Sequence, residues 1–302
     1  MSTSHYDTTS LAPSSHYDTT SPAPLGLLVH PTRNVDQPRQ DVLDWARANH
    51  VEVVPLPLDA GDTDQGGDPG RCSLIVAIGG DGTALAAIRR AATCGRPVLG
   101  VACGSLGALT SVPADEVARA LDRFQAGEWS PRELPALRIE TGDGESLRAF
   151  NDIALVRGGG SQLRVSARLN GALYVRVAGD GCIVSTAVGS SAYTIAAGGP
   201  LLDPRLAAFV LTRLPTHGGF SPSLVMTEDS TLELEVFAGH GGGRLEVDGR
   251  VDGELPERLK VSLERAVATV VAFEDQESHL LGLRRRGIIT DSPRILADEA
   301  RA

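Results

Sequence analysis

The sequence contains few cysteines and no pattern that indicates a zinc site. Its four cysteines include no pair with C-x-x-C spacing, and its seven histidines form no H-E-x-x-H motif. We therefore expect no structural or catalytic zinc site. A chain of 302 residues with so few cysteines and no apolar signal-peptide core near Met1 is expected to be cytoplasmic, with reduced thiols.

Long hydrophobic runs and an excess of positive charge are also missing. No apolar run is long enough to span a bilayer, so no membrane partner is expected. The formal net charge of −10 and the pI near 5.2 argue against nucleic acid as a partner. A G-x-x-x-x-G-K-[ST] motif is absent, which argues against a Walker-type NTPase. An acidic protein can still bind a small anion in one local cradle.

One stretch organises the chain, residues 73–83, Ser-Leu-Ile-Val-Ala-Ile-Gly-Gly-Asp-Gly-Thr. The apolar run predicts a strand that is buried on both faces, and the alanine-rich segment that follows predicts a helix ending before Gly95. A glycine turn at a helix N-terminus favours phosphate. Because Asp81 stands in this turn, we expect phosphoryl transfer, with Asp81 as general base or metal partner. The alternative interpretation is that Asp81 only caps the helix.

The predicted fold is a Rossmann-like α/β N-terminal domain followed by an all-β C-terminal domain, a layered sheet or sandwich. In the first domain, residues 25–132, predicted strands alternate with helices, which implies a parallel sheet. These strands are 25–30, 51–58, 74–78 and 97–102, and the helices are 37–49, 84–92 and 113–127. A Gly/Asp-rich loop is expected at 59–70.

Residues 133–283 are expected to form a β-rich substrate-binding and oligomerisation domain. Alternation with period two, as in Thr231-Leu-Glu-Leu-Glu-Val, indicates an antiparallel arrangement. The predicted strands are 136–140, 150–157, 163–169, 173–187, 231–238, 244–247 and 260–273, with one helix at 190–198.

Both ends of the chain are predicted to be tails. Residues 1–24 are poor in apolar side chains, and Ser4–Ser10 recurs as Ser15–Ser21, which predicts a disordered segment. Residues 284–302 begin with Arg284-Arg285-Arg286 and continue as a polar tail. The arginine triplet is interpreted as a solvated charge run, with a phosphate contact as the alternative.

The order of the motifs carries more information than any single motif. The turn from Gly79 to Thr83 is followed by Gly104-Ser-Leu-Gly107, Asn151-Asp152, Gly179-Asp180-Gly181 and a long stretch from Ser185 to Pro200. Diacylglycerol kinases, sphingosine kinases and some phosphofructokinases carry a similar first turn. The T-x-x-G-S-[ST]-A-Y…A-G-G-P pattern after a G-D-G is more specific. With these motifs, the chain from about Leu25 to Leu283 resembles the NAD kinase family.

The resemblance implies a role for each matching residue. Asp81 would take the proton from the ribose 2′-hydroxyl, in a turn that it shares with Gly80, Gly82 and Thr83. The remaining residues implied to bind the substrate are Asn151, Asp152, Asp180, Ser191, Ala192, Tyr193, Ala196 and Arg250. The implied donor is ATP with Mg²⁺, and the implied assembly is a homodimer or homotetramer.

Each of these positions also has a plain structural interpretation. Asn151 and Asp152 could form a turn pair at the start of a strand. Asp180, which lies between two glycines, could occupy a hairpin turn, and Tyr193 could be a core residue.

Several positions depart from the family pattern. Alanine stands where the family commonly has an asparagine, an aromatic, a basic residue and a serine, and the late D-G-Q-like element ends in arginine. These positions are Ala102, Ala108, Ala178, Ala196 and Arg250. The P-H-x-L-x-x-R-P stretch is also weakened, at Pro215–Pro222.

Three functions follow from the motifs and their departures. The first is transfer of the ATP γ-phosphate to the 2′-hydroxyl of the adenosine ribose of NAD, giving NADP. The second is the same chemistry on another nucleoside, ribosyl or sugar hydroxyl, because a ring contact or a buried hydrogen bond lost at each alanine removes about 1 kcal/mol. The third is a nucleotide-binding sensor without catalysis, against which the presence of Asp81 speaks.

Overall fold

The computed structural model describes residues 23–58 and 67–299. The repeat in the predicted N-terminal tail and most of the loop predicted at 59–70 lie outside the described residues.

The N-terminal half is a parallel sheet flanked by helices, as predicted. Its strands lie in the order β4-β3-β1-β2, and β5 pairs with β4. The strands are β1 (Leu25–Val29), β2 (Val53–Pro55), β3 (Leu74–Gly79), β4 (Pro97–Ala102) and β5 (Val112–Pro113). The helices are α1 (Asp36–Ala48), α2 (Asp81–Ala92) and α3 (Val117–Gln125). Every residue of β3 and β4 is buried, as expected for strands covered on both faces.

The C-terminal half is built from two packed antiparallel layers. In the larger sheet its strands are β6 (Ser130–Thr141), β7 (Ser146–Ala149), β9 (Leu163–Leu169), β10 (Ala172–Gly179), β14 (Leu232–Ala238) and β17 (Arg258–Ala272). The smaller sheet holds β8 (Asp152–Arg157), β11 (Gly181–Thr186), β12 (Ala208–Arg213), β13 (Leu224–Thr227), β15 (Gly243–Val247) and β16 (Arg250–Glu254). Alternate residues of both layers, such as Leu155 and Leu234, form one buried core between them.

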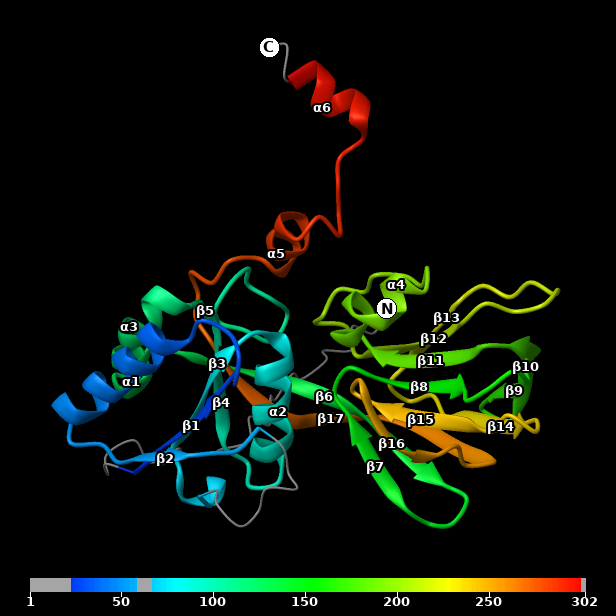
Figure 1. Cartoon of the computed structure of the whole chain (residues 1–302), viewed down its shortest axis with the longest axis horizontal. Coiled ribbons are helices and arrows are strands. Elements are labelled where there is room, and N and C mark those ends of the chain that lie inside the picture. Colours follow the sequence, from blue (N-terminus) through cyan, green and yellow to red (C-terminus); the bar gives the residue numbers. More distant parts are fainter. Residues whose placement is uncertain (1–22, 59–66, 300–302) are drawn as a thin grey trace, which may run out of the picture.

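A long strand makes the two halves continuous. β17 pairs antiparallel with β6 and β14, and its end pairs parallel with β4 through Thr269 and Val270. Over the part of the chain that the structure describes, the larger sheet therefore has 11 strands, and it runs through both halves (Figure 1). Helix α2 packs against β3, β4 and β17, and Figure 1 shows it on the side of the α/β half that faces the β-rich half.

The strand predicted at 173–187 is two strands that belong to different sheets. β10 pairs with β9 in the larger sheet, whereas β11 pairs with β8 and β12 in the smaller one. The glycines on either side of Asp180 permit this crossing. A Cβ on Gly179 would lie 2.2 Å from the carbonyl oxygen of Pro215, and one on Gly181, where φ is +138°, would lie 1.8 Å from that of Leu155. The hairpin interpretation of Asp180 is therefore wrong.

Short helices complete the chain. The helix predicted at 190–198 is a 3₁₀ turn (Gly189–Ser191) followed by α4 (Tyr193–Ala196). After β17 come α5 (His279–Arg285) and α6 (Pro293–Glu299), and Figure 1 shows α6 projecting away from the body. Within the described ranges, no helix combines the length and the apolar character that a membrane span requires.

Candidate functional site

The Asp81 carboxylate binds backbone amides of a neighbouring loop. Gly80 is the N-cap residue of α2, and Asp81 is the first residue of the helix. Its Oδ2 accepts a hydrogen bond from the N–H of Ala108 at 3.1 Å, and its Oδ1 accepts one from the N–H of Leu109 at 3.0 Å. The interpretation of Asp81 as a simple helix cap is therefore wrong. The side chain remains 29% exposed, so it is open to a ligand.

The glycines at and around the Asp81 turn differ in the space available for a side chain. A Cβ on Gly79 would lie 2.3 Å from Thr83 Oγ1, and one on Gly107 would lie 1.9 Å from Asp81 Oδ1. A Cβ on Gly82 would meet nothing within 4 Å. Gly82 therefore marks the open side of the turn, where a ligand can approach the first amides of α2.

A buried aspartate supports Asn151 and Asp152. Asp248 accepts hydrogen bonds from the backbone N–H groups of Phe150, Asn151 and Asp152, at 3.2, 2.7 and 3.3 Å. Burial raises the pKa of Asp248, and these N–H groups oppose that shift. Asp248 is not among the residues predicted from the sequence to bind the substrate. The available signal was the Asp-Gly turn, in which Asp248 has φ +50° and Gly249 has φ +75°.

The Asp152 side chain is buried among other acids. Burial raises its pKa to about 7, and the negative charges of Asp248 and Glu246 contribute to the same shift. The backbone N–H of Tyr193 donates a hydrogen bond to the Asp152 carboxylate, and this hydrogen bond opposes the rise in pKa. Asp152 therefore changes its charge near neutral pH.

The turn after β11 is fixed against Asn151. Thr186 Oγ1 donates a hydrogen bond to the carbonyl oxygen of Phe150 at 2.7 Å. A Cβ on Gly189 would lie 1.9 Å from the carbonyl oxygen of Asn151. Ser185 and Thr194 share a buried hydrogen bond of 2.7 Å between their hydroxyls. These contacts hold the short helix α4 and leave Tyr193 39% exposed, so its interpretation as a core residue is wrong.

Asp180 lies near Tyr193. Both line a hollow of about 310 Å³, together with Arg157 and Arg244. The carboxylate of Asp180 forms an ion pair of 2.6 Å with Arg157 Nε. Tyr193 therefore contacts Asp152 through its backbone N–H and shares a hollow with Asp180. The two aspartates lie at opposite ends of the pairing of β8 with β11, where Asp152 is opposite Ser185 and Gly181 is opposite Val156.

The other predicted binding residues lie next to Tyr193 in the chain or on β16. Ser191 Oγ donates to the carbonyl oxygen of Val188 at 3.0 Å. Ala192 and Ala196 are exposed on either side of Tyr193, and Arg250 is exposed at the start of β16.

The Asp81 turn and the Asn151 strand rest on a shared core. Ala84 and Leu85 from the first turns of α2 belong to the same buried cluster as Ala108, Phe150 and Val188. The two groups of predicted site residues are therefore fixed relative to one another.

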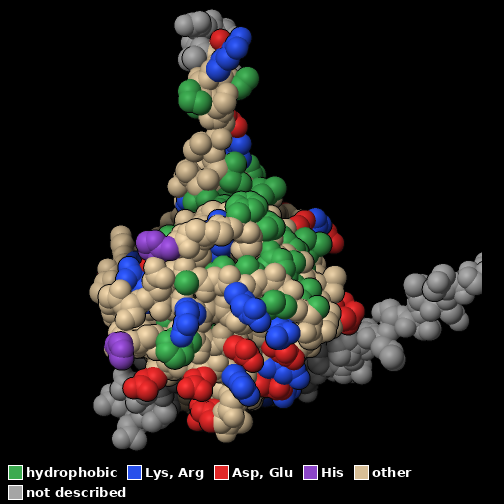
Figure 2. All heavy atoms as spheres, turned by 90° about the vertical axis from the view of Figure 1, so that its right-hand side faces the viewer, with side chains coloured by type: hydrophobic (Ala, Val, Ile, Leu, Met, Phe, Trp, Pro, Cys, Tyr) green, Lys and Arg blue, Asp and Glu red, His purple; other side chains and the backbone are tan. Residues whose placement is uncertain are grey.

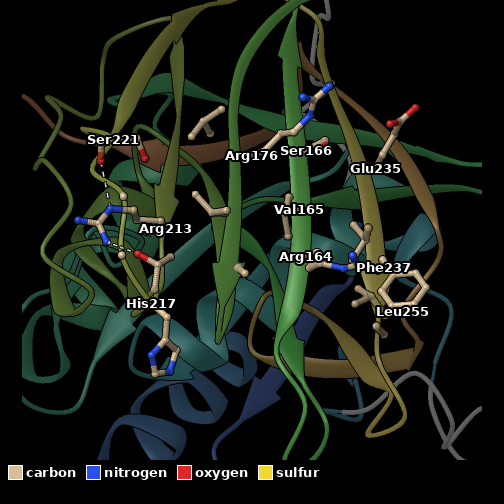
Figure 3. Close-up of a pocket in the computed structure, with 18 of the residues that line it drawn as sticks. Arg164, Val165, Ser166, Arg176, Arg213, His217, Ser221, Glu235, Phe237 and Leu255 are labelled. Atoms are coloured by element: carbon tan, nitrogen blue, oxygen red, sulfur yellow. Dashed lines mark hydrogen bonds between the residues drawn. The ribbon is translucent and has the colours of Figure 1, made fainter.

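Another cavity lies away from these residues. It measures about 990 Å³ and contains none of the predicted binding residues, although Ala178 lines it. Figure 3 shows Arg164, Arg176 and Arg213 around it. Within residues 23–58 and 67–299, no group of three His, Cys, Asp or Glu side chains could hold a metal ion.

Comparison with known families identifies both halves of the chain. The family model described as the ATP-NAD kinase N-terminal domain matches residues 61–129. The model described as the ATP-NAD kinase C-terminal domain matches residues 150–273.

Curated relatives match over most of their length. An NAD kinase of Natronomonas pharaonis is 37% identical over 229 residues, which cover 71% of this chain and 83% of that protein. NAD kinase 1 of Streptomyces coelicolor is 29% identical, with 91% of this chain and 88% of that protein covered.

Two solved structures share the fold. Yeast NADH kinase complexed with NADH has a TM-score of 0.72 at 20% identity, and 90% of each chain is covered. An NAD kinase from Archaeoglobus fulgidus in complex with ATP has a TM-score of 0.69 at 22% identity, with 87% of this chain and 98% of that chain covered. Because the family models account for both halves and a relative at 37% identity is covered over 83% of its length, the chain belongs to the NAD kinase family.

Proposed function

We propose that the protein transfers the γ-phosphate of ATP to the 2′-hydroxyl of the adenosine ribose of NAD, giving NADP. The observation that carries the proposal is a carboxylate, Asp81, held by two amides at the start of α2 beside the open position at Gly82. The chain belongs to a family whose curated relatives are named NAD kinases, and a neighbour of the same fold was solved with ATP.

Residues on the open side of the turn are suited to the donor phosphates. Gly82 and Thr83 lie in the first turn of α2, where N–H groups have no acceptor within the helix, and these groups and the positive end of the helix dipole favour negative charge there. Mg²⁺ would enter as MgATP, because such an ion is held largely by phosphate oxygens with one or two carboxylates. The site therefore needs no preformed protein cage for the ion, and the Asp81 carboxylate stays available for the proton.

The reaction then needs a proton acceptor and a positioned hydroxyl. As the ribose oxygen forms its bond to the γ-phosphorus, the bond from phosphorus to the β,γ-bridging oxygen breaks and ADP leaves. The 2′-hydroxyl proton passes to Asp81. Asn151 and Asp152 offer an amide and a carboxylate to vicinal ribose hydroxyls, and the exposed ring of Tyr193 offers a flat apolar face.

Incubation of the purified protein with NAD, ATP and Mg²⁺ tests the proposal, with NADP measured by a coupled dehydrogenase. We expect turnover by the native protein and a loss of about 100-fold or more in Asp81→Asn. Because asparagine cannot accept both amide hydrogen bonds, the folded fraction of this variant must be measured at the assay temperature. No NADP at high enzyme concentration would refute the proposal, and turnover would exclude a pure sensor.

The departures at Ala102 and Ala108 support a test of other acceptors. Both side chains are buried, at 2% and 5% exposure, so they fill the core beside the Asp81 turn. NADH, nucleosides and sugars should be compared with NAD as acceptors, and polyphosphate with ATP as donor. If another acceptor has a higher kcat/KM than NAD, the diverged-kinase alternative replaces the first assignment.

We propose that the β-rich half also forms the contacts of a cytoplasmic homo-oligomer. Phe220 is 85% exposed and Phe237 is 56% exposed, and both line the cavity of Figure 3. Figure 2 views the molecule from the right-hand side of Figure 1 and shows apolar side chains gathered in the upper part of that face. Light scattering should give the mass of a dimer or tetramer, and Phe237→Glu should shift it toward the monomer.

A further inference from the structure

The helix that follows the last core strand is fixed against the loop that holds Asp81. The family models end at residue 273, so α5 lies beyond the part of the chain they match. Leu283 is fully buried, and a Cβ on Gly282 would lie 2.2 Å from the carbonyl oxygen of Leu106. Helix α5 is therefore a packed element whose position is set by the 104–109 loop.

The three consecutive arginines at the end of α5 point to three different carboxylates. Arg284 pairs with Asp291 through both of its terminal nitrogens. Arg285 Nη1 pairs with Glu277 at 2.7 Å. Only Arg286 faces the site, with Nη1 3.7 Å from Asp81 Oδ2 and Nε donating to the carbonyl oxygen of Gly282 at 3.3 Å.

The Arg286–Asp81 contact leaves the guanidinium able to take another anion. A separation of 3.7 Å is longer than a hydrogen bond, so the pair is held by charge attraction without a directed bond. Both side chains are about one-third exposed, at 32% and 29%. A phosphate that reaches the start of α2 can therefore replace the carboxylate as the partner of Arg286, and it offers bidentate geometry.

Two more nitrogen groups beside Asp81 have unused hydrogen-bonding capacity. Arg132 donates to the carbonyl oxygen of Ala108 at 2.8 Å, and its buried Nε has no partner. The buried Nδ1 of His279, at the start of α5, also has no partner. Burial lowers the pKa of both groups, while the charge of Asp81 raises it, so both lie within reach of that charge.

We propose that Arg286 binds the terminal phosphates of the nucleoside triphosphate donor and stabilises the charge that develops as the γ-phosphoryl group is transferred. This role rests on the proposed kinase function. Without donor, Arg286 lies against Asp81. When the phosphates arrive, the guanidinium turns to them, and Asp81 is freed from the neighbouring cation to accept the hydroxyl proton. Arg132 and its buried Nε support the same negatively charged region.

The arginine triplet supplies its own controls. Arg284→Ala, Arg285→Ala and Arg286→Ala remove the same side chain from the last two positions of α5 and from its C-cap, and only the third faces Asp81. We expect kcat/KM for ATP to fall by about 100-fold or more in Arg286→Ala, with KM for NAD within about twofold of the native value. The other two variants should keep ATP kinetics within about threefold, and Arg286→Lys should recover part of the loss.

A binding measurement separates this assignment from the proposed function. Titration of MgATP into the protein without NAD should give a weaker Kd in Arg286→Ala than in Arg285→Ala, while thermal melts of the two variants agree. If the native protein makes no NADP, the proposed function fails, and the ATP titration still decides the role of Arg286. Equal ATP affinity in the two variants, or a loss confined to KM for NAD, would overturn the assignment.

Discussion

The guanidinium of Arg89 reaches the carboxylate of Asp248, with 3.8 Å between Nη1 and Oδ2. Arg89 lies on α2, the helix that begins at Asp81. Asp248 accepts hydrogen bonds from the backbone N–H groups of Asn151 and Asp152. The Asp248 side chain is fully buried. This pair therefore links the helix of the proposed base to the strand that holds the proposed ribose-binding residues.

Removal of Arg89 should destabilise the protein through Asp248. In Arg89→Met the apolar stem is kept, but a buried carboxylate loses its cation, so we expect a loss of about 2 kcal/mol in the free energy of unfolding. The loss should grow with pH, because the folded state must then keep Asp248 charged without its partner. Urea denaturation at pH 5.5 and pH 8 measures both effects.

A double-mutant cycle provides the control. In the Asp248→Asn background the carboxylate that faces Arg89 is gone, so Arg89→Met should cost less than about 0.5 kcal/mol. Equal costs in the two backgrounds would show that Arg89 acts through other contacts.

The titration of Asp152 should make stability depend on pH. Its pKa is about 7 in the folded protein, whereas an unfolded aspartate titrates near 3.9. Between these values the folded state keeps a proton that the unfolded state has lost, so stability falls as the pH rises from about 4 to about 7. Asp152→Asn should remove this slope and increase stability at pH 8, by up to about 2 kcal/mol, in chemical denaturation.

The same titration should affect binding of the acceptor. Ionised Asp152 accepts hydrogen bonds from ribose hydroxyls more strongly than the neutral acid does, so KM for NAD should fall as the pH rises from 6 to 8. In Asp152→Asn the pH dependence should disappear and KM should be several-fold higher. A pH dependence that persists in the variant would assign the titration to another group.

Local pattern was sufficient to predict the elements around Asp81. Strand β4 occupies the predicted residues 97–102, and β3 extends the predicted strand by a single residue to Gly79. The apolar runs and the glycines that end them define these elements in sequence, so no distant partner is needed to recognise them.

The support around the site depends on contacts between distant residues. Arg286 meets Asp81 only because α5 packs on the 104–109 loop, and in sequence it is one of three equivalent arginines. The pairing of β17 with β4, which makes one sheet of the two halves, likewise rests on side chains far apart in the chain. Periodicity reports which face of an element is apolar and gives no information about its partner.

The open space over Gly82 should tolerate an alanine in the folded protein and exclude the ligand. A Cβ there meets no atom within 4 Å, and alanine is favoured in a helix over glycine by about 0.5–1 kcal/mol. Gly82→Ala should therefore melt at or above the native temperature while kcat/KM for ATP falls by at least about tenfold. Gly160→Ala, in an equally open loop position, should leave activity unchanged, and full activity in Gly82→Ala would place the donor elsewhere.

Gly107 should be required for the position of the Asp81 carboxylate. A Cβ on Gly107 would lie 1.9 and 2.1 Å from the two Asp81 oxygens, so alanine must displace the carboxylate from the amides of Ala108 and Leu109. We expect Gly107→Ala to lose about 1–3 kcal/mol of stability and, under conditions where it is folded, to lower kcat by about 10- to 100-fold. Gly142→Ala is the matched control, because its Cβ would meet Arg258 at an ordinary 3.6 Å. A native kcat in folded Gly107→Ala would contradict this requirement. The proton acceptor would then be another carboxylate.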